Sequence, residues 1–429
     1  MPVNLSPLKE INKFKPLKED FIFPDYKKYS ISNIASSVSN LFGIKSEKNN
    51  LPEHVLPNNG EESVVLFLID GLGFNQFQKN INQIKLFKKL EKKSEIFPLT
   101  SVFPSTTPAA LTSIHTGLTP QEHGLPEWTV YFEEADKIIE TLPFRPIFDP
   151  NRETMLGLGG YPEMLYEGNT IYLDLKKDGI KSFLFTNQEY HDSAYSKMSQ
   201  NGAEVIGYST YSDLITKLIS NLESYKKPAY YFIYWTSIDS SQHAFGPNSN
   251  EHFLSMEYLS SILENEFFSK ISPEVSKKIK FIMTADHGQS SIKGEDIIYL
   301  NNYLNLESSY LWGKSKRAIH PTGSPHDVFL HIFDPKIKEI LDFLRTELKQ
   351  KADILLIDEA IDMGLFGTGV PTEKFIKRIG DILILPHLGY HVWYKHIEGF
   401  EWKQKGIHGG LSEDEMLVPF ISTNLSNLI

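Results

Sequence analysis

A series of short apolar runs along the chain constrains the fold more than any other feature. The runs are rich in Val, Ile, Leu, Phe or Tyr, with a polar or turn residue close behind each: Ser63–Ile69, Ser182–Thr186, Ala229–Trp235, Lys280–Thr284 and Asp381–Leu385. Such runs are typical of strands buried on both faces of a sheet. Helical patterns lie between them, at Pro108–Thr116, Ser212–Tyr225, Ser255–Phe268 and Ile337–Leu348. This alternation predicts an α/β fold with a mostly parallel central sheet flanked by helices.

The chain of 429 residues divides into four expected segments. Residues 1–60 are Lys-rich, with one short amphipathic stretch at Ile31–Phe42, and we expect them to be peripheral. Residues 61–297 form the expected catalytic core. Residues 298–378 contain a strand-like run (Val328–Phe333), a helix and a second apolar run (Ile354–Ile357), which predict a smaller α+β insertion near the mouth of the active site. Residues 379–429 are expected to return to the core.

Composition excludes several classes of function. The net charge of −11 argues against a broad nucleic-acid or membrane surface, which would need a basic face, although bound metal ions can still attract an anionic substrate. Without cysteine, any metal must be bound by His, Asp or Glu. The N-terminus has no apolar signal segment and runs such as Val64–Ile69 are too short to cross a bilayer. We therefore expect a cytoplasmic protein without a membrane segment; the sequence gives no oligomeric state.

Acidic and histidine residues follow the predicted strands. Asp70 directly follows the first run and precedes Gly71, and Asp286 and His287 follow the run that ends at Thr284. Ligands of open α/β sheets bind at the carboxyl ends of strands. Each position also fits an ordinary strand-end turn. If the side chains are buried, however, they need a partner, and a metal ion would supply one.

Two further positions carry possible metal ligands. Asp239 and His243 lie four residues apart, so they can share one face of a helical turn and reach one ion, although such a pair can also be a surface hydrogen bond. His408 lies in the glycine-rich stretch Lys405–Gly410, which on its own also fits a turn with an incidental histidine.

Thr107 occupies a position suited to a nucleophile. We expect it to cap a helix whose first residue is Pro108 and which ends at Gly117. An ordinary capped helix explains this pattern equally well. However, a hydroxyl at a helix N-terminus faces unpaired N–H groups that bind phosphate, and a nearby cation would make the hydroxyl nucleophilic. Together, the hydroxyl and the two sets of ligands match what a two-metal phosphoryl-transfer site requires.

At this point the chain resembles the alkaline phosphatase superfamily, and within it the type I phosphodiesterase/nucleotide pyrophosphatase family. The matching motifs are Phe-Pro-Ser-Thr-Thr-Pro at 103–108, Thr-Gly-Leu-Thr-Pro-Gln-Glu-His-Gly at 116–124, Asp239 with His243, and Ala-Asp-His-Gly at 285–288. The resemblance implies that Asp70, Asp286 and His287 hold one metal ion, with Thr107 bridging towards it. It implies that Asp239, His243 and His408 hold a second. The family usually binds two zinc ions, with manganese as the alternative, and His123 in the His-Gly turn is expected to be structural.

One departure from the family concerns substrate binding. Well-studied nucleotide pyrophosphatases place an asparagine that donates to a phosphate oxygen where this chain has Trp128, preceded by Glu127. Candidate replacements are the backbone N–H of Thr107 and the basic stretch Lys314–Arg317. Lys314 and Arg317, with Lys316, His320 and His326, could contact a distal phosphate or a nucleotide. The competing interpretation, a solvated surface loop, is favoured for such a charge cluster.

The resemblance implies a metal-dependent hydrolase that cleaves phosphodiester or pyrophosphate bonds of small molecules such as nucleotides through a covalent phospho-threonine intermediate. Alternatives are a phosphomonoesterase or a phosphomutase of the same superfamily, which often use serine with additional Lys and Arg contacts, and a non-catalytic metal-binding sensor or scaffold. Sulfatases are disfavoured because they need Cys or Ser in a Cys/Ser-x-Pro-x-Arg motif, and the arginine is absent after Pro108.

Overall fold

The computed structural model describes residues 3–18 and 20–429. Within these residues seven strands form the central sheet, in the order β2, β18, β9, β1, β8, β6, β7. Their bounds are Glu95–Thr100, Leu417–Asn424, Ile279–Thr284, Ser63–Ile69, Ala229–Trp235, Lys181–Asn187 and Glu204–Tyr208, respectively. β9, β1, β8, β6 and β7 are parallel, whereas β18 runs antiparallel between β2 and β9. The mostly parallel central sheet predicted from the apolar runs is confirmed.

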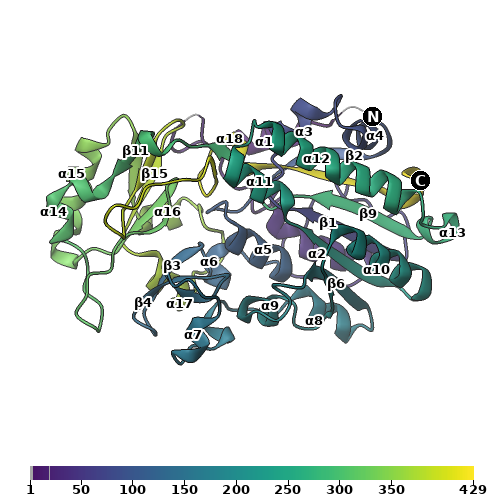
Figure 1. Ribbon diagram of the computed structural model, residues 1–429, viewed down its shortest axis with the longest axis horizontal. Coiled ribbons are helices and arrows are strands. Elements are labelled where there is room, and N and C mark those ends of the chain that lie inside the picture. Colours follow the sequence, from purple (N-terminus) through teal and green to yellow (C-terminus); the bar gives the residue numbers. More distant parts are fainter. Residues whose placement is uncertain (1–2, 19) are drawn as a thin grey trace.

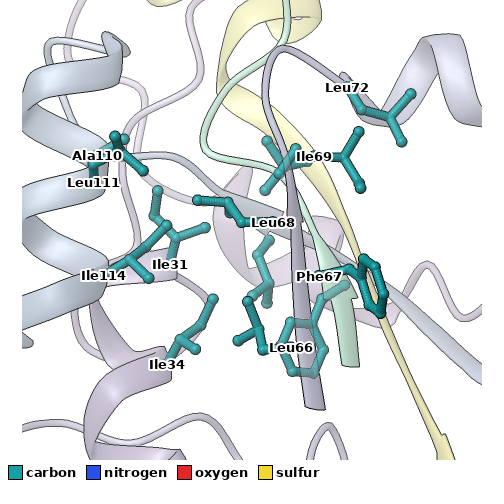
Figure 2. Packing of buried hydrophobic residues seen from close by; sticks show 14 of the residues in the cluster. Ile31, Ile34, Leu66, Phe67, Leu68, Ile69, Leu72, Ala110, Leu111 and Ile114 are labelled. Carbon is teal, nitrogen blue, oxygen red and sulfur yellow. The ribbon is translucent and has the colours of Figure 1, made fainter. Parts of the chain in front are cut away.

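The central strand β1 is buried on both faces. Leu66 and Leu68 point towards Ile31, Ile34 and helix α5 (Thr107–Thr116), whereas Phe67 points to the opposite face (Figure 2). The expectation that the first sixty residues are peripheral is therefore wrong for this stretch. The apolar side of the short helices η1 (Ile31–Asn33) and α2 (Ile34–Leu41) is part of the main hydrophobic core.

Two helical layers cover the central sheet. Helices of one layer contact each other on the side of Leu66 and Leu68: α2, α5, α8 (Ile171–Lys177) and α9 (Ala194–Ser199). The other layer contains α4 (Lys85–Lys93), α10 (Tyr211–Ser224) and α12 (Asn250–Ile262) (Figure 1). Helix α12 continues as a π-helix through Phe268. Because the sheet is covered on both faces, its strand ends are the place where polar side chains from different strands can meet.

A second lobe lies beside the central sheet in Figure 1. Among the described residues it contains a sheet of four antiparallel strands, called here the small sheet: β12 (Thr322–Ser324), β13 (Asp327–Leu330), β15 (Ile382–Pro386) and β14 (Ala352–Leu356). Helix α15 (Ile337–Glu347) contacts β14. The expected α+β character of this region is confirmed. The apolar run Asp381–Leu385 is a strand, but its place in the series of central strands was wrong, because β15 pairs with β13 and β14.

Smaller elements connect the two lobes. A ribbon of β3 (Thr129–Phe132), β4 (Lys137–Glu140) and β5 (Arg145–Pro146) follows the helix that carries Thr107, and β3 contacts β12 of the small sheet. Two short pairs, β10 (Ser290–Ser291) with β17 (Gly406–Ile407) and β11 (Ile297–Tyr299) with β16 (His391–Trp393), join the region after β9 to the C-terminal part. No helix among the described residues combines the length and apolar character needed to span a bilayer. The four expected segment boundaries stay a prediction.

Candidate metal centre

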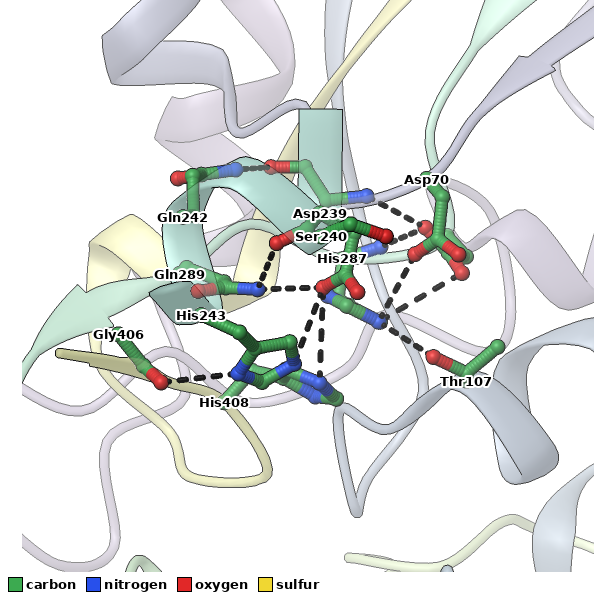
Figure 3. Close-up of polar contacts among 12 residues, drawn as sticks. Asp70, Thr107, Asp239, Ser240, Gln242, His243, His287, Gln289, Gly406 and His408 are labelled. Carbon is green, nitrogen blue, oxygen red and sulfur yellow. Dashed lines mark hydrogen bonds and ion pairs between the residues drawn. The ribbon is translucent and has the colours of Figure 1, made fainter. Parts of the chain in front are cut away.

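The predicted ligands converge at the carboxyl end of the central sheet. Asp70 directly follows β1, and Asp286 and His287 follow β9, the neighbouring strand. Asp239 lies on helix α11 (Ser237–Phe245), which starts just after β8 on the other side of β1. Three adjacent parallel strands thus deliver their polar residues to one place. Figure 3 shows Asp70, Asp239 and His287 pointing towards one another.

The first group of ligands consists of Asp70, Asp286 and His287. Their candidate ligand atoms all lie within 4.8 Å of one another. The Nε2 atom of His287 is 3.6 Å from Oδ1 of Asp70 and 3.5 Å from Oδ2 of Asp286. Both of these carboxylate oxygens are buried and make no hydrogen bond. Because an unpaired buried carboxylate oxygen is costly, these residues fit a bound cation.

The second group consists of Asp239, His243 and His408, whose ligand atoms also lie within 4.8 Å of one another. Oδ1 of Asp239 is 3.3 Å from Nε2 of His243 and 3.9 Å from Nε2 of His408. The ring of His408 stacks on that of His287 of the first group, with centroids 3.7 Å apart. The two groups are therefore neighbours, and the glycine-rich stretch around His408 reaches the same site.

The three histidines share one orientation. The Nδ1 atoms of His287, His243 and His408 lie 3.0, 2.9 and 3.0 Å from the carbonyl oxygens of Gly288, Gly406 and Ser105, respectively. A carbonyl can only accept, so each Nδ1 donates its proton and each Nε2 faces the carboxylates, where a bound cation would accept its lone pair. Histidines that bind metals through one nitrogen and donate the other to a carbonyl have this arrangement.

The electrostatics of the centre also favour cations. Burial raises the pKa of Asp70 well above its usual value, and the carboxylates of Asp286 and Asp239 raise it further. Burial likewise raises the pKa of Asp286, and it lowers that of His408. Asp239 differs: burial alone would raise its pKa, but His243, His408 and His287 together lower it. Burial would lower the pKa of His243, but the carboxylate of Asp239 raises it overall. Carboxylate and imidazole ligands are the set that zinc prefers.

Thr107 lies beside the first group. Its Oγ1 atom is 3.0 Å from Nε2 of His287. Thr107 is the first residue of α5, and Thr106, with an extended backbone (φ −120°, ψ 151°), is the N-cap. The prediction that Thr107 is the cap was wrong by one residue, because its own backbone is already helical. The hydroxyl still lies in the first turn among unpaired N–H groups, and the helix ends as predicted at Gly117 in a left-handed conformation (φ 68°).

Side chains that sequence reasoning missed position these ligands. The hydroxyl of Tyr234 donates to Oδ2 of Asp70, and the amide of Gln289 donates to Oδ1 of Asp239. The backbone N–H of Gly71 donates to Oδ1 of Asp286 over 3.1 Å. Gln289 follows the Ala-Asp-His-Gly motif directly, which was an available signal. Tyr234 lies within an apolar strand, and the sequence carried no signal for it.

Two cavities meet at the centre. Both are lined by Thr107, Trp128 and Asp239. The first, of about 250 Å³, extends past Asp70 towards side chains that include Leu111, Arg152, Leu184, Tyr190, Tyr195 and Gln200. The second, of about 330 Å³, extends past His243 and His408 towards Glu127, Phe148, Ser324, Trp393, Phe400 and Trp402. A bound phosphate at Thr107 would therefore have room for a substituent on each side.

The predicted substrate contacts have different positions. Trp128 lines both cavities and its side chain is partly exposed. Lys314 and Arg317 lie on an exposed loop, where Nζ of Lys314 pairs with Glu133 at 3.7 Å, and neither lines the two cavities at Thr107. Arg152, which sequence reasoning missed, lines the first cavity instead.

His123 is fully buried. Its ring nitrogens lie 3.2 Å from Oγ of Ser113 and 3.1 Å from the backbone N of Leu125, whose N–H donates to Nδ1. This burial supports the structural role expected for His123.

Comparisons with known proteins agree with this geometry. Human ectonucleotide pyrophosphatase/phosphodiesterase family member 1 is 24% identical over 249 residues, covering 56% of this chain and 25% of that protein. A Schizosaccharomyces pombe protein named as an uncharacterized pyrophosphatase/phosphodiesterase is 20% identical over 260 residues, covering 58% of this chain and 50% of that one. The chain thus spans half or less of the length of these relatives.

Solved structures show the same fold. Murine ectonucleotide pyrophosphatase / phosphodiesterase 5, an inactive variant in complex with AMP, superimposes with a TM-score of 0.62 at 18% identity, covering 85% of this chain and 88% of that chain. Residues 64–411 match the family described as type I phosphodiesterase / nucleotide pyrophosphatase. Because this match includes most of the chain and all of the ligands described above, the chain belongs to the type I phosphodiesterase/nucleotide pyrophosphatase family.

Proposed function

We propose that this protein is a metal-dependent hydrolase of phosphodiester or pyrophosphate bonds in nucleotides, with Thr107 as the nucleophile. The observation that carries the proposal is the position of Oγ1 of Thr107. It lies at a helix N-terminus, 3.0 Å from Nε2 of His287, beside two complete groups of metal ligands.

Asp70, Asp286 and His287 would hold one cation and Asp239, His243 and His408 the other, and zinc suits both sets. When bound, such ions lower the pKa of a coordinated hydroxyl and offset negative charge on the reacting phosphate. Each set offers three candidate ligands from the chain itself, and Oγ1 of Thr107 lies beside the first set.

The chain's own residues then define the reaction. Oγ1 of Thr107 gives up its proton to solvent and forms a bond to phosphorus while the bond from phosphorus to the leaving oxygen breaks, which gives phospho-threonine and a leaving group that keeps the electron pair. Water subsequently attacks phosphorus and loses a proton, while the bond to Oγ1 breaks and Oγ1 takes up a proton, which releases a phosphomonoester and restores the Thr107 hydroxyl. Through both steps the free N–H groups in the first turn of α5 face the non-bridging oxygens and stabilise their charge.

The two cavities support a diester or pyrophosphate over a phosphomonoester. A monoester has one organic substituent and would leave one cavity filled by water. The cavities meet at Thr107, Trp128 and Asp239, so a phosphate there can carry a group in each. The partly exposed ring of Trp128, which lines both, offers a flat apolar surface on which a nucleobase can stack.

The nucleotide part of the proposal is supported by relatives named as nucleotide pyrophosphatases and by the murine structure that contains AMP. The first cavity combines aromatic, hydroxyl and amide side chains with the guanidinium of Arg152, which suits a nucleoside bearing a phosphate. A cytoplasmic location stays a prediction.

The test is turnover of bis-p-nitrophenyl phosphate and of dinucleoside polyphosphates by zinc-loaded protein. We expect Thr107→Ala to abolish turnover without loss of zinc, and Thr107→Ser to retain part of it, because serine keeps the hydroxyl. Retained turnover in Thr107→Ala would exclude the nucleophile assignment. A wild-type protein that binds zinc but turns over neither diesters nor monoesters would instead support the sensor or scaffold alternative.

A further inference from the structure

Two buried carboxyl groups lie outside the two ligand groups, and one of them, Glu127, lines the second cavity. Glu127 precedes Trp128 and is 1% exposed, and Asp327 begins β13 of the small sheet and is fully buried. Oε2 of Glu127 accepts from the backbone N–H groups of Trp128 and, over 3.1 Å, Thr129. Oδ1 of Asp327 accepts from the hydroxyl of Ser324. One oxygen of each carboxyl is thus held by the protein.

The other oxygens have no partner. Among the described residues, Oε1 of Glu127, Oδ2 of Asp327 and Oγ1 of Thr106 are buried and make no hydrogen bond, and neither carboxyl forms an ion pair with Lys or Arg. Thr106 is the N-cap of the helix that carries Thr107. Three side chains that are far apart in the sequence therefore each have a buried oxygen without a hydrogen bond, and one of them, Thr106, caps helix α5.

The loop after His408 brings these groups together. A Cβ atom built on Gly409 would lie 2.5 Å from Oδ1 of Asp327, 2.6 Å from Oγ of Ser324 and 3.3 Å from Cγ2 of Thr106. The backbone of Gly409 (φ 126°) can approach this closely only because it has no side chain. Thr106, Glu127 and Ser324 also line the second cavity together with Thr107 and His408. Asp327, Ser324 and Thr106 thus lie around Gly409, directly after His408, and Glu127 faces the cavity that Thr106 and Ser324 line.

The charges of the two carboxyls disfavour each other. Burial raises the pKa of Glu127 to about 8. Burial, and then the neighbouring Glu127, raise the pKa of Asp327 well above its usual value. Two such groups without a basic partner either stay protonated or share a cation.

We propose that Glu127 and Asp327 hold a third divalent cation, assisted by the hydroxyls of Thr106 and Ser324. The donors are oxygens only, which suits Mg²⁺ rather than zinc, in contrast to the Asp/His groups. Mg²⁺ keeps several waters and commonly binds through one or two carboxylates plus substrate phosphates. Its catalytic consequence rests on the proposed function: the cation would supply positive charge to a phosphate oxygen where related pyrophosphatases use an asparagine. The binding site itself does not depend on that function.

The experiment measures bound Mg²⁺ directly. Zinc-loaded wild type, Glu127→Gln and Asp327→Asn are brought to equilibrium by dialysis against MgCl₂, and zinc and magnesium per chain are determined by mass spectrometry. We expect one Mg²⁺ per chain in wild type, none in either variant, and unchanged zinc in all three. Glu153→Gln is the matched control, because Glu153 also has a buried carboxylate oxygen without a hydrogen bond but lies outside this cluster. It should bind Mg²⁺ as wild type does.

A second readout separates the cation from a pair of protonated carboxyls. Ligand binding to the folded state raises the melting temperature, so Mg²⁺ should raise that of wild type and of Glu153→Gln but not that of Glu127→Gln or Asp327→Asn. Absence of Mg²⁺ from wild type, or unchanged Mg²⁺ in both isosteric variants, would overturn the proposal. Each variant removes a different proposed ligand. If one of them is insoluble, bound Mg²⁺ in the other is therefore enough to test the proposal. Thr107→Ala should lose turnover yet keep Mg²⁺. Turnover and Mg²⁺ binding are thus measured independently, so a failure of the proposed function is distinguished from a failure of the cation site.

Discussion

The two groups of candidate metal ligands are built differently. Asp70, Asp286 and His287 follow neighbouring strands of the central sheet and are almost completely buried. Asp239 and His243 lie on a helix, His408 comes from a loop 165 residues further along the chain, and all three are partly accessible. The strand ends are fixed by the hydrogen bonds of the sheet, whereas the loop needs its own supports. We therefore expect the first group to bind its ion tightly and the second group to depend on how that loop is held.

The largest effect is expected from His287→Ala. This change removes a ligand of the first group and the contact to Thr107, so both the ion and the orientation of the nucleophile are lost. Loss of even an outer-shell partner costs roughly 10–100-fold, so we expect kcat/KM for a diester to fall by more than about 100-fold. Steady-state kinetics with zinc analysis check this, and activity within tenfold of wild type would contradict it.

The next effect, smaller than the loss of activity in His287→Ala, is a difference in how readily the two groups release zinc to a chelator. Titration of zinc-loaded wild type with a chelator should release zinc in two phases, with the accessible second group first. In His408→Ala the early phase should be absent, leaving one zinc per chain, because the first group keeps all its ligands. A zinc-sensitive dye records both phases. Release in a single phase from wild type would show that the two groups do not differ.

A still smaller effect is expected from the support of the His408 loop. Oε1 of Glu415 accepts from the backbone N–H of Gly410 over 3.2 Å and lies 2.7 Å from Nδ1 of His326. Glu415→Gln keeps the shape but weakens these charge-assisted contacts, so we expect about tenfold weaker zinc binding at the second group and unchanged binding at the first. Competition with a chelator of known affinity measures both. Equal weakening of both groups would indicate a general loss of stability.

The smallest effect concerns the basic loop of the small-sheet lobe. Lys314 and Arg317 are exposed and line neither cavity at Thr107, so Arg317→Ala should change KM for any substrate by less than about twofold. Arg152→Ala should raise KM for substrates with a second phosphate, because Arg152 lines the first cavity. The reverse pattern in a substrate panel would restore the basic loop as a phosphate contact.

The clustering of Asp70, Asp286 and His287 could be predicted from the sequence because its signal is local, whereas their role as metal ligands stays a prediction. A run of apolar residues indicates a buried strand, and a carboxylate just after it must lie at the edge where ligands bind, as Asp70 and Asp286 do. His408 carried no such signal, and only the family resemblance connected it to Asp239 and His243. The supports, such as Tyr234 and Glu415, were missed because their contacts join residues far apart in the chain.

The errors in the fold have a similar origin. Asp381–Leu385 has the apolar character of a central strand, but composition shows that a strand is buried without showing which sheet it joins. Likewise the Lys-rich character of the first sixty residues hid the few apolar side chains, Ile31 and Ile34 among them, that cover β1. Which strands pair with each other depends on the whole chain, so a local sequence pattern cannot predict it.

The antiparallel strand β18 has a consequence for biosynthesis. It lies between β2 and β9, yet it comprises residues 417–424 and is synthesised after the other six strands of the central sheet. Until then the nascent sheet has unpaired backbone edges at β2 and β9, the kind of surface that invites aggregation. The strands that precede Asp70 and Asp286 can therefore pair early, but the central sheet stays open between β2 and β9 until residues 417–424 have been synthesised.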